Sequence, residues 1–326
     1  MVVLEYKDVE EKYRNKLDSM FGKKDCLVEV HPGKVLLPPY IKDVGERIQN
    51  LKVYKDDVWL SSYPRTGSTW TQEMVWCLGN NMDFNKAKTV MNLERTPLLE
   101  LSVLLSNEEG DWKDNIKDTI SMVENLTSPR FIKTHLPWCL LPKEIYSVKP
   151  KIIYVARNPK DMCVSYYHFL KLVHNMEGSF TDFCELMLAG KVPIGLIWDH
   201  IRGYWERRND PNILFVKYED MKKNHREIIL KTAEFLGVSY SDDKITQLLD
   251  HLSFKGMREN NTLNLDPILQ VKNGPGFVYK DDVRFIRKGQ IGDWKNYMDD
   301  EMAGRFDRWT EENLRGSGLS FESSVV

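Results

Sequence analysis

Residues 63–70 of this chain read Tyr63-Pro64-Arg65-Thr66-Gly67-Ser68-Thr69-Trp70. An apolar, strand-like run at residues 58–60 comes before this stretch, and a helical pattern of apolar residues at 74–78 comes after it. A strand, a glycine-containing loop and a helix in this order can hold an anion, because the glycine lets the backbone come close and the helix start supplies free N–H groups. The stretch is not a Walker A loop, since no lysine follows Gly67. It therefore predicts a phosphate-like ligand without identifying it.

The rest of the chain predicts an α/β fold around this loop. Strand-like runs with continuous Ile, Val, Leu and Phe character occur at residues 58–61, 131–133, 152–155 and 213–216. Such runs are typical of buried parallel strands. Helical patterns lie at residues 71–78, 160–173 and 220–236, the last followed by Gly237 as a helix end. We predict a single domain, residues 1–326, with a central, mostly parallel sheet flanked by helices and ligands at the carboxyl ends of its strands. About 40 residues at the N-terminus and about 10 at the C-terminus are expected to be peripheral.

Composition narrows the class of protein. The 326 residues include 46 Lys and Arg against 48 Asp and Glu, a net charge of −2, which argues against nucleic-acid binding through a basic surface. We find neither a leader sequence nor a membrane-spanning run. The 5 cysteines are scattered without a Cys-x-x-Cys pair, which argues against a zinc site. We therefore expect a cytoplasmic enzyme without a metal, and with no nucleic acid or membrane as partner.

Three further groups of residues could complete an anion site. Lys133-Thr134-His135 follows one predicted strand, Arg157-Asn158-Pro159 follows the next and leads to Ser165, and Arg287-Lys288-Gly289 lies near the C-terminus. Each group alone is more typical of a turn or a solvated surface. Together with residues 63–70, they predict a divided site for an anion at the strand ends.

These blocks resemble the cytosolic sulfotransferases, which move a sulfuryl group from 3′-phosphoadenosine 5′-phosphosulfate (PAPS) to a hydroxyl or amine. The family's loop reads Tyr-Pro-Lys-Ser-Gly-Thr-Thr-Trp, and residues 63–70 match it closely. Lys-Thr-His-Leu-Pro is found at 133–137, and Tyr-Val-Ala-Arg-Asn-x-Lys-Asp begins a block at 154–169. Tyr-Glu-Asp is found at 218–220, Ser-Phe-Lys-x-Met at 253–257, and Arg-Lys-Gly-x-x-Gly-Asp-Trp-Lys at 287–295. The blocks keep the family's order over most of the chain, and no metal is implied.

The resemblance implies a set of residues that bind PAPS. Loop residues would hold the 5′-phosphosulfate, and Arg157 and Ser165 would hold the 3′-phosphate with help from residues 287–289. Trp70 would stack on the adenine, although an ordinary core tryptophan is the alternative. The predicted donor-binding residues are Arg65, Thr66, Gly67, Ser68, Thr69, Trp70, Arg157, Ser165, Tyr218, Ser253, Phe254, Met257, Arg287, Lys288 and Gly289.

The resemblance also implies a direct in-line transfer. His135 would be the general base, Lys133 and Arg65 would stabilise charge on the transferring group, and Ser165 would restrain a catalytic cation. The acceptor would be a small apolar molecule such as a phenol, a steroid-like alcohol or a retinoid-like alcohol. Its predicted contacts are Trp138, Phe169 and Phe84, with a loop at residues 264–277, although each aromatic residue could equally be core.

The chain departs from the family pattern in two places. Arg65 stands where the family has a lysine, and a guanidinium is bulkier and forked where an ammonium is compact. Asp299 and Asp300 replace the Thr-Val of the family's dimer-forming segment, so we expect a monomer or a weak homodimer. Two other functions stay open from the residues alone, a kinase of nucleotides or small molecules and a nucleotide-binding protein without catalysis.

Overall fold

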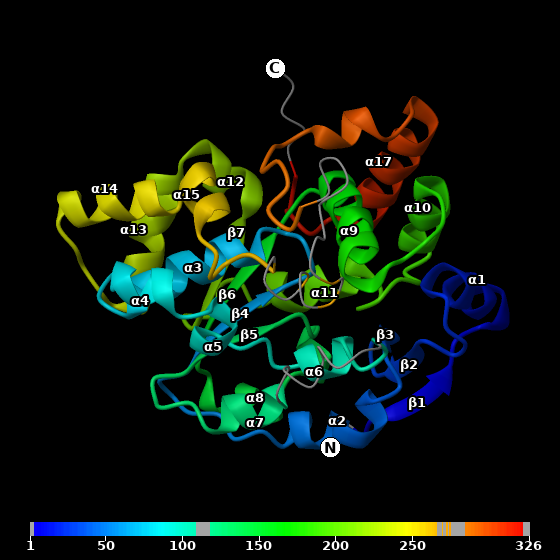
Figure 1. The fold of residues 1–326 in the computed structure, drawn as a ribbon, viewed down its shortest axis with the longest axis horizontal. Helices are drawn as coiled ribbons and strands as arrows, with labels where there is room; N and C mark the ends of the chain where they lie inside the picture. Colours follow the sequence, from blue (N-terminus) through cyan, green and yellow to red (C-terminus); the bar gives the residue numbers. More distant parts are fainter. Residues whose placement is uncertain are drawn as a thin grey trace.

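Four parallel strands form the central sheet, in the spatial order β5-β4-β6-β7 (Figure 1). They are β4 (Val58–Ser62), β5 (Phe131–Thr134), β6 (Lys151–Ala156) and β7 (Ile213–Lys217). In the register, Val58 lies opposite both Phe131 and Lys151, and Ile152 lies opposite Ile213. The predicted parallel sheet is therefore confirmed, and each strand begins and ends within about one residue of its predicted bounds.

The structure is a computed structural model that describes residues 3–108, 118–265, 269, 272, 274 and 284–321. Most of the predicted acceptor loop, residues 264–277, lies outside these ranges. Among the described part of the chain, no helix is both long and apolar enough to cross a bilayer.

Helices cover both faces of the sheet, and each face has its own core. Trp59 and Ile152 lie in the core with α9 (Pro159–His174), α11 (Ile197–Trp205) and α17 (Asp300–Leu314). Leu60 and Ile153 point the other way, toward α3 (Ser68–Gly79), α13 (His225–Leu236) and α14 (Asp242–His251). Figure 1 shows α3, α13 and α14 together on one side. Because both faces are buried, each strand contains a continuous apolar run and does not alternate between apolar and polar residues.

The helix predicted over residues 220–236 is in fact two helices. α12 (Tyr218–Lys223) ends before Asn224, and α13 begins after it. The side chain of Asn224 accepts a hydrogen bond from the backbone N–H of Glu227, and thus caps α13 in the manner that favours a new helix start. Gly237 ends α13 with a φ of 80°, as predicted.

A second, antiparallel sheet at the N-terminus was not predicted. It consists of β1 (Glu5–Asp8), β2 (Val28–His31) and β3 (Val35–Leu37), in that spatial order. β3 is fully buried, and the carbonyl of Leu36 accepts a bond of 2.9 Å from the N–H of Ile194. The expectation that the first 40 or so residues are peripheral is therefore wrong for β2 and β3, which belong to the core around α9. At the other end Leu319 is also buried.

Shorter helices connect these elements. Their bounds are α1 (Glu11–Phe21), α2 (Ile41–Gln49), α4 (Phe84–Thr89), α5 (Asn92–Arg95), α6 (Leu101–Leu104), α7 (Thr119–Glu124), η2 (Trp138–Leu140), α8 (Ile145–Val148), α10 (Phe180–Leu188), α15 (Phe254–Glu259) and η3 (Asp293–Asn296).

Candidate functional site

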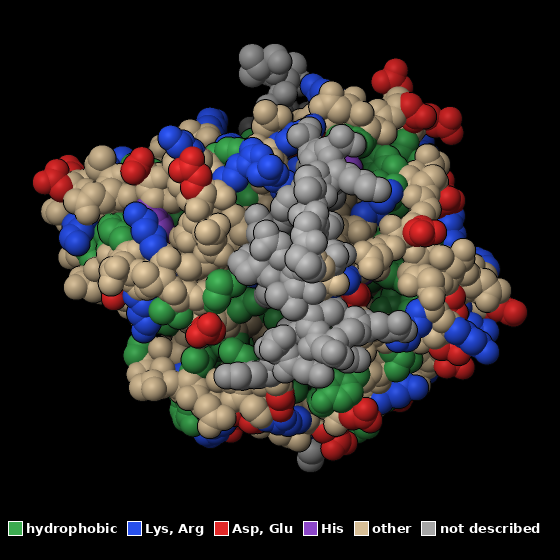
Figure 2. Space-filling model, in the orientation of Figure 1, with side chains coloured by type: hydrophobic (Ala, Val, Ile, Leu, Met, Phe, Trp, Pro, Cys, Tyr) green, Lys and Arg blue, Asp and Glu red, His purple; other side chains and the backbone are tan. Residues whose placement is uncertain are grey.

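Two cavities meet at the carboxyl ends of β4, β5 and β6. One, here called the basic cavity, has a volume of about 140 Å³ and is lined by Arg157, Lys222, Arg287 and Lys288 among others. The other, called the apolar cavity, has about 170 Å³ and is lined chiefly by leucine and aromatic side chains. Arg65, Ser68, Thr69 and Phe285 line both. Figure 2 shows Lys and Arg side chains gathered on this face of the molecule, near α12.

The loop between β4 and α3 forms the floor that both cavities share. Gly67 adopts a φ of 98° just before α3, and a Cβ added to it would lie 2.6 Å from the ring of Tyr218, so only glycine fits. The first N–H groups of α3, from Ser68 onward, have no carbonyl one turn earlier in the helix to bond. The hydroxyl of Thr66 donates to the carbonyls of Tyr63 and Val155, and thus holds the loop in place. The loop offers an anion backbone N–H groups, as predicted from its sequence.

The basic cavity holds more positive than negative charge. Arg157 follows β6 and donates to the carbonyl of Gln290, and its guanidinium lies 4.4 Å from the ring centre of Tyr218. Asp293 bonds both Arg287, at 2.5 Å, and Lys288, at 2.9 Å. Burial raises the pKa of Asp293, but its bonds from Lys288 and Arg287 outweigh this and lower it to about 2. Asp293 is therefore ionised and orders these two cations.

Two buried donors in the basic cavity are left unsatisfied. The Nε atoms of Arg157 and Arg287 have no hydrogen-bond partner among the residues that the structure describes. Buried donors are nearly always paired in folded proteins. An anionic ligand such as a phosphate would supply the missing acceptors.

Aromatic and apolar residues form the other wall of the basic cavity. Trp70 lines it and is held by a bond of 2.9 Å from its Nε1 to the carbonyl of Leu252. Phe254 and Met257 line it too, and the ring of Phe254 lies so close to Gly289 that a Cβ there would be 2.8 Å away. Ser253 is not among the lining residues, and its hydroxyl caps α15 by accepting from the N–H of Gly256 at 3.0 Å.

Lys133 and His135 lie at the end of β5 and line the apolar cavity. Nδ1 of His135 is 2.8 Å from the carbonyl oxygen of Ser62. A carbonyl can only accept, so Nδ1 carries the proton and Nε2 keeps its lone pair. Burial and the nearby charge of Lys133 hold the pKa of His135 well below its usual range. The ring is therefore neutral near pH 7, as a general base must be.

Glu100 supports this segment and was missed by the sequence reasoning. Its carboxylate accepts from the backbone N–H of His135 at 2.6 Å and from the hydroxyl of Thr134 at 2.9 Å. Burial raises the pKa of Glu100 to about 7, although these bonds and Lys133 oppose the rise. Burial also lowers the pKa of Lys133 to about 8, Glu100 opposing this and Arg65 adding to it. The only sequence signal was a single acid within an apolar run, Leu98-Leu99-Glu100-Leu101.

Arg65 and Ser165 lie together at the junction of the two cavities. Nε of Arg65 donates to the Ser165 hydroxyl at 3.2 Å. The backbone of Arg65 has a φ of 67°, in the left-handed region that non-glycine residues seldom adopt. Burial lowers the pKa of Arg65 to about 9, with Arg157 and Arg287 adding repulsion. The structure thus brings the four predicted catalytic residues, Arg65, Lys133, His135 and Ser165, to one edge of the sheet.

The predicted acceptor residues are only partly placed together. Phe169 lines the apolar cavity, with Leu170 and Val173 on the same face of α9. Trp138 is not among the lining residues, and packs instead on Tyr204 and Tyr146. Phe84 belongs to the core on the other face of the sheet and lies against His251. Both predictions need correction, because aromatic character near a motif does not show which way a side chain points.

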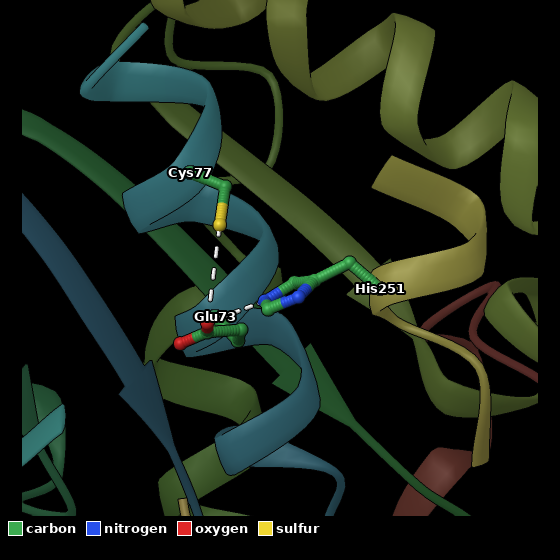
Figure 3. A group of neighbouring side chains, drawn as sticks. All are labelled: Glu73, Cys77 and His251. Carbon is green, nitrogen blue, oxygen red and sulfur yellow. Dashed lines mark hydrogen bonds and ion pairs between the residues drawn. The ribbon is translucent and has the colours of Figure 1, made fainter. Parts of the chain in front are cut away.

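A second group of ionisable residues lies between α3, which carries Glu73 and Cys77, and the end of α14, which carries His251. Glu73 bonds Nε2 of His251 at 2.7 Å, and Cys77 approaches the same carboxylate oxygen (Figure 3). These three residues have a geometry that could hold a metal. However, Arg95 pairs with the other Glu73 oxygen at 2.8 Å, and burial raises the pKa of the Cys77 thiol. Arg95 already supplies the counter-charge, and the thiol stays protonated, so the contacts favour a buried ion-pair network.

Comparison with known proteins agrees with this geometry. The family model described as "Sulfotransferase domain" matches residues 55–318. The chain belongs to the sulfotransferase family. It is 38% identical to the luciferin sulfotransferase of Photinus pyralis over 285 residues, which cover 85% of this chain and 76% of that protein. It is 32% identical to sulfotransferase 1E1 of Homo sapiens over 303 residues, which cover 91% and 96% of the two chains.

Solved structures of related proteins share the fold of this sulfotransferase. A crystal structure of retinol dehydratase with retinol and PAP matches it with a TM-score of 0.89 at 26% identity, over 99% of this chain and 100% of that chain. A second structure of retinol dehydratase, with androsterone and inactive cofactor PAP, has a TM-score of 0.88. The predicted family, fold class and enzyme class are therefore confirmed.

Proposed function

We propose that this sulfotransferase transfers a sulfuryl group from PAPS to the hydroxyl, or amine, of a small apolar acceptor such as a phenol, a steroid-like alcohol or a retinoid-like alcohol. One observation carries the proposal. A cavity rich in cations and a cavity lined by apolar side chains meet at Arg65, while Lys133 and His135 line the second of them. A phosphate-bearing donor and an apolar acceptor would thus face each other across catalytic side chains.

The residues of the basic cavity fit PAPS. Arg157 and Arg287 have unsatisfied buried donors that suit the 3′-phosphate, together with Lys288 and Ser165. The loop N–H groups at Ser68 and Thr69 suit the 5′-phosphosulfate. The related structures named above contain PAP, which supports PAPS as the donor. The proposed binding of PAPS by these residues does not require a metal ion.

The transfer uses side chains of this chain for positioning and proton transfer. When bound, PAPS supplies an activated sulfuryl group. Nε2 of His135 takes the proton of the acceptor hydroxyl, whose oxygen forms a bond to sulfur as the bond from sulfur to the phosphate oxygen breaks. Lys133 and Arg65 balance the negative charge that gathers on the oxygens during the step. Ser165 orients Arg65 through its hydroxyl.

The acceptor class rests on the lining of the apolar cavity. Leu98, Leu101, Leu104, Phe169 and Leu170 offer an apolar wall beside His135. Retinol and androsterone are bound by the related retinol dehydratase, and other relatives are named for luciferin and for amines. These names support an apolar alcohol or phenol as the first acceptors to test.

The proposal is tested by incubating the protein with radiolabelled PAPS, or with radiolabelled ATP in a parallel reaction, and a panel of phenols, steroid alcohols, retinoid alcohols and amines, with and without EDTA. We expect label on at least one acceptor class regardless of EDTA. A His135→Ala variant should lose about 10²–10⁴-fold in turnover. A His31→Ala variant, altered on β2 outside both cavities, is the matched control. Metal-dependent phosphate transfer from ATP, without sulfate transfer, would contradict the proposal.

We also propose that the protein is a monomer or a weak homodimer. Asp299, in place of the family's dimer-forming residues, caps α17 by accepting from the N–H of Met302 at 2.8 Å. Sedimentation over a concentration series checks this. A tight dimer that dissociates when Tyr297 is changed would show that this segment still pairs.

A further inference from the structure

Arg65 is a largely buried cation that has no carboxylate partner among the residues the structure describes. Nη2 of its guanidinium donates to the carbonyl of Phe285 at 2.7 Å, and Nε donates to the hydroxyl of Ser165. Both partners are neutral. A buried charge without a counter-ion is costly, so other contacts must hold the guanidinium in place.

Two aromatic rings provide those contacts. The guanidinium carbon of Arg65 lies 5.1 Å from the ring centre of Phe169 and 5.0 Å from that of Phe285. The two rings are 6.2 Å apart and inclined at 56°, so the guanidinium lies near the faces of both. A cation over an aromatic face gains about 0.5–1 kcal/mol when exposed and about 2 kcal/mol or more when desolvated. The pair of rings, called here the aromatic clamp, therefore offsets part of the cost of burying the charge.

Phe285 links the clamp to both substrates. It lines the basic and the apolar cavity, and Arg65 does the same. Phe169 extends from α9 along the wall of the apolar cavity. The clamp thus lies at the boundary between the site we assign to the donor and the site we assign to the acceptor.

The shape of the clamp suits arginine and not lysine. A guanidinium is planar, so it can stack on rings through its faces while its edge donates hydrogen bonds. An ammonium is compact and strongly hydrated, and cannot use two ring faces and a carbonyl in this way. Arg65, which stands where the family's loop has a lysine, is the residue that both rings contact.

We propose that Phe285 and Phe169 are positioning residues that fix the Arg65 guanidinium toward the transferring sulfuryl group, and that this clamp is what lets arginine serve where the family has lysine. The inference rests on the proposed function for its kinetic consequence. The contacts that carry it are those of Arg65 with Phe169 and Phe285.

A double-mutant cycle tests the proposal. Phe285→Leu should lower kcat about tenfold in the native background, and Phe285→Tyr should restore most of it because it keeps the ring. In the Arg65→Lys background, Phe285→Leu should cost less than about twofold, since the clamp has no guanidinium to hold. Affinity for PAP, which lacks the sulfonate, should change by less than about twofold in each variant, and thermal unfolding should confirm that each is folded. An equal loss of kcat in both backgrounds would overturn the proposal.

A second readout needs no turnover. In protein labelled with ¹⁵N-arginine, the Nε–Hε signal of Arg65, assigned by its loss in Arg65→Lys, should be protected from solvent exchange, and Phe285→Leu should speed its exchange at least about tenfold. Tyr54→Leu is the matched control, since it removes a ring that lies 4.4 Å from the guanidinium of Arg130, away from both cavities. Unchanged exchange in Phe285→Leu would overturn the clamp, whereas failure to transfer sulfate by the native protein would instead overturn the proposed function.

Discussion

Arg65 precedes α3 and Arg95 ends α5, and the protein holds these two arginines by different contacts. Arg95 pairs with Glu73 at 2.8 Å and lies 4.3 Å from the ring centre of Trp76. Arg65 also contacts aromatic rings, but its hydrogen bonds go to a hydroxyl and a carbonyl. Both are held in place by the protein, yet only Arg95 has its charge cancelled. The difference indicates that Arg95 is structural, and that the charge of Arg65 is kept for an anionic ligand.

The surroundings of the two arginines support this interpretation. Arg157 and Arg287 repel Arg65 and help lower its pKa to about 9, after burial, which is the main cause. An arrangement that gathers more cations than acids is unfavourable in the empty protein and becomes favourable when a polyanion binds. Glu73, in contrast, is fully buried with Arg95 and His251 and leaves no charge for a ligand.

Arg95→Met should have the largest effect on stability. The change leaves the Glu73 carboxylate buried without its cation, which typically costs about 3–5 kcal/mol. Urea titration measures this cost as a decrease in the free energy of unfolding. Arg47→Met, which breaks half-exposed pairs with Asp118 and Glu124, is the control and should cost about 1 kcal/mol. Equal losses in the two variants would remove the structural role of Arg95.

Arg65→Met should act on turnover and not on stability. Loss of a preorganised cation at the developing charge should lower kcat by about 10²–10³-fold. The free energy of unfolding should stay the same or rise, because a buried charge near two other cations is removed. Steady-state kinetics and urea titration on the same preparation give both values. Arg202→Met, on the exposed pair with Asp199, is the control for turnover. If Arg65→Met lowered the free energy of unfolding but kept its kcat, Arg65 would be structural, contrary to the comparison with Arg95.

The pH dependence should reflect Lys133. Its pKa of about 8 lies below its usual value, so its positive charge is lost as pH rises through that value. We expect kcat/KM to fall above about pH 8, since this parameter follows the free enzyme. Glu100→Gln removes the negative charge that raises the pKa of Lys133, so the fall should move to lower pH. If kcat/KM of Glu100→Gln falls at the same pH as in the native protein, or at a higher pH, a group other than Lys133 controls the pH dependence.

Metal ions should have almost no effect at the Glu73–Cys77–His251 group. Because Arg95 neutralises Glu73, neither EDTA nor added Zn²⁺ should move Tm by more than about 1 °C, the scale of a few tenths of a kcal/mol. Differential scanning calorimetry measures this, with Cys77→Ala as the variant that removes one of the three potential ligands. A zinc-dependent rise in Tm that disappears in Cys77→Ala would show that the group binds metal.

Prediction from the sequence was most accurate where a strand is followed directly by its functional residues. Residues 58–70 and 131–135 each carry an apolar strand and the residues at its end, so the sheet and the position of Lys133 and His135 followed from local pattern. Asn224 shows the limit of this reasoning, because a polar residue within an amphipathic run can cap a new helix without interrupting the apolar period. The N-terminal sheet was missed because its buried strands are short and lie among charged residues.

Residues that act through distant contacts could not be predicted. Phe285 meets Arg65 across more than two hundred positions of the chain, and Glu100 meets His135 across 35. Neither lies in a motif with its partner, and burial, which makes both important, is a tertiary property. The predictions for Trp138 and Phe84 were wrong for another reason. These aromatic residues lie near motifs and were expected in the cavity, but Trp138 lies in one core and Phe84 packs against the other.

The central claim is that Arg65 faces the transferring sulfuryl group, which only PAPS carries, whereas Arg157 faces the 3′-phosphate, which both PAPS and PAP carry. Titration calorimetry of both ligands against Arg65→Met and Arg157→Met tests it most directly. We predict that Arg157→Met weakens both ligands alike, by about tenfold or more, as expected for the loss of a charge-assisted pair. Arg65→Met should leave PAP affinity within about twofold of native and weaken PAPS alone. If Arg65→Met weakened PAP as much as Arg157→Met does, the claim would be contradicted.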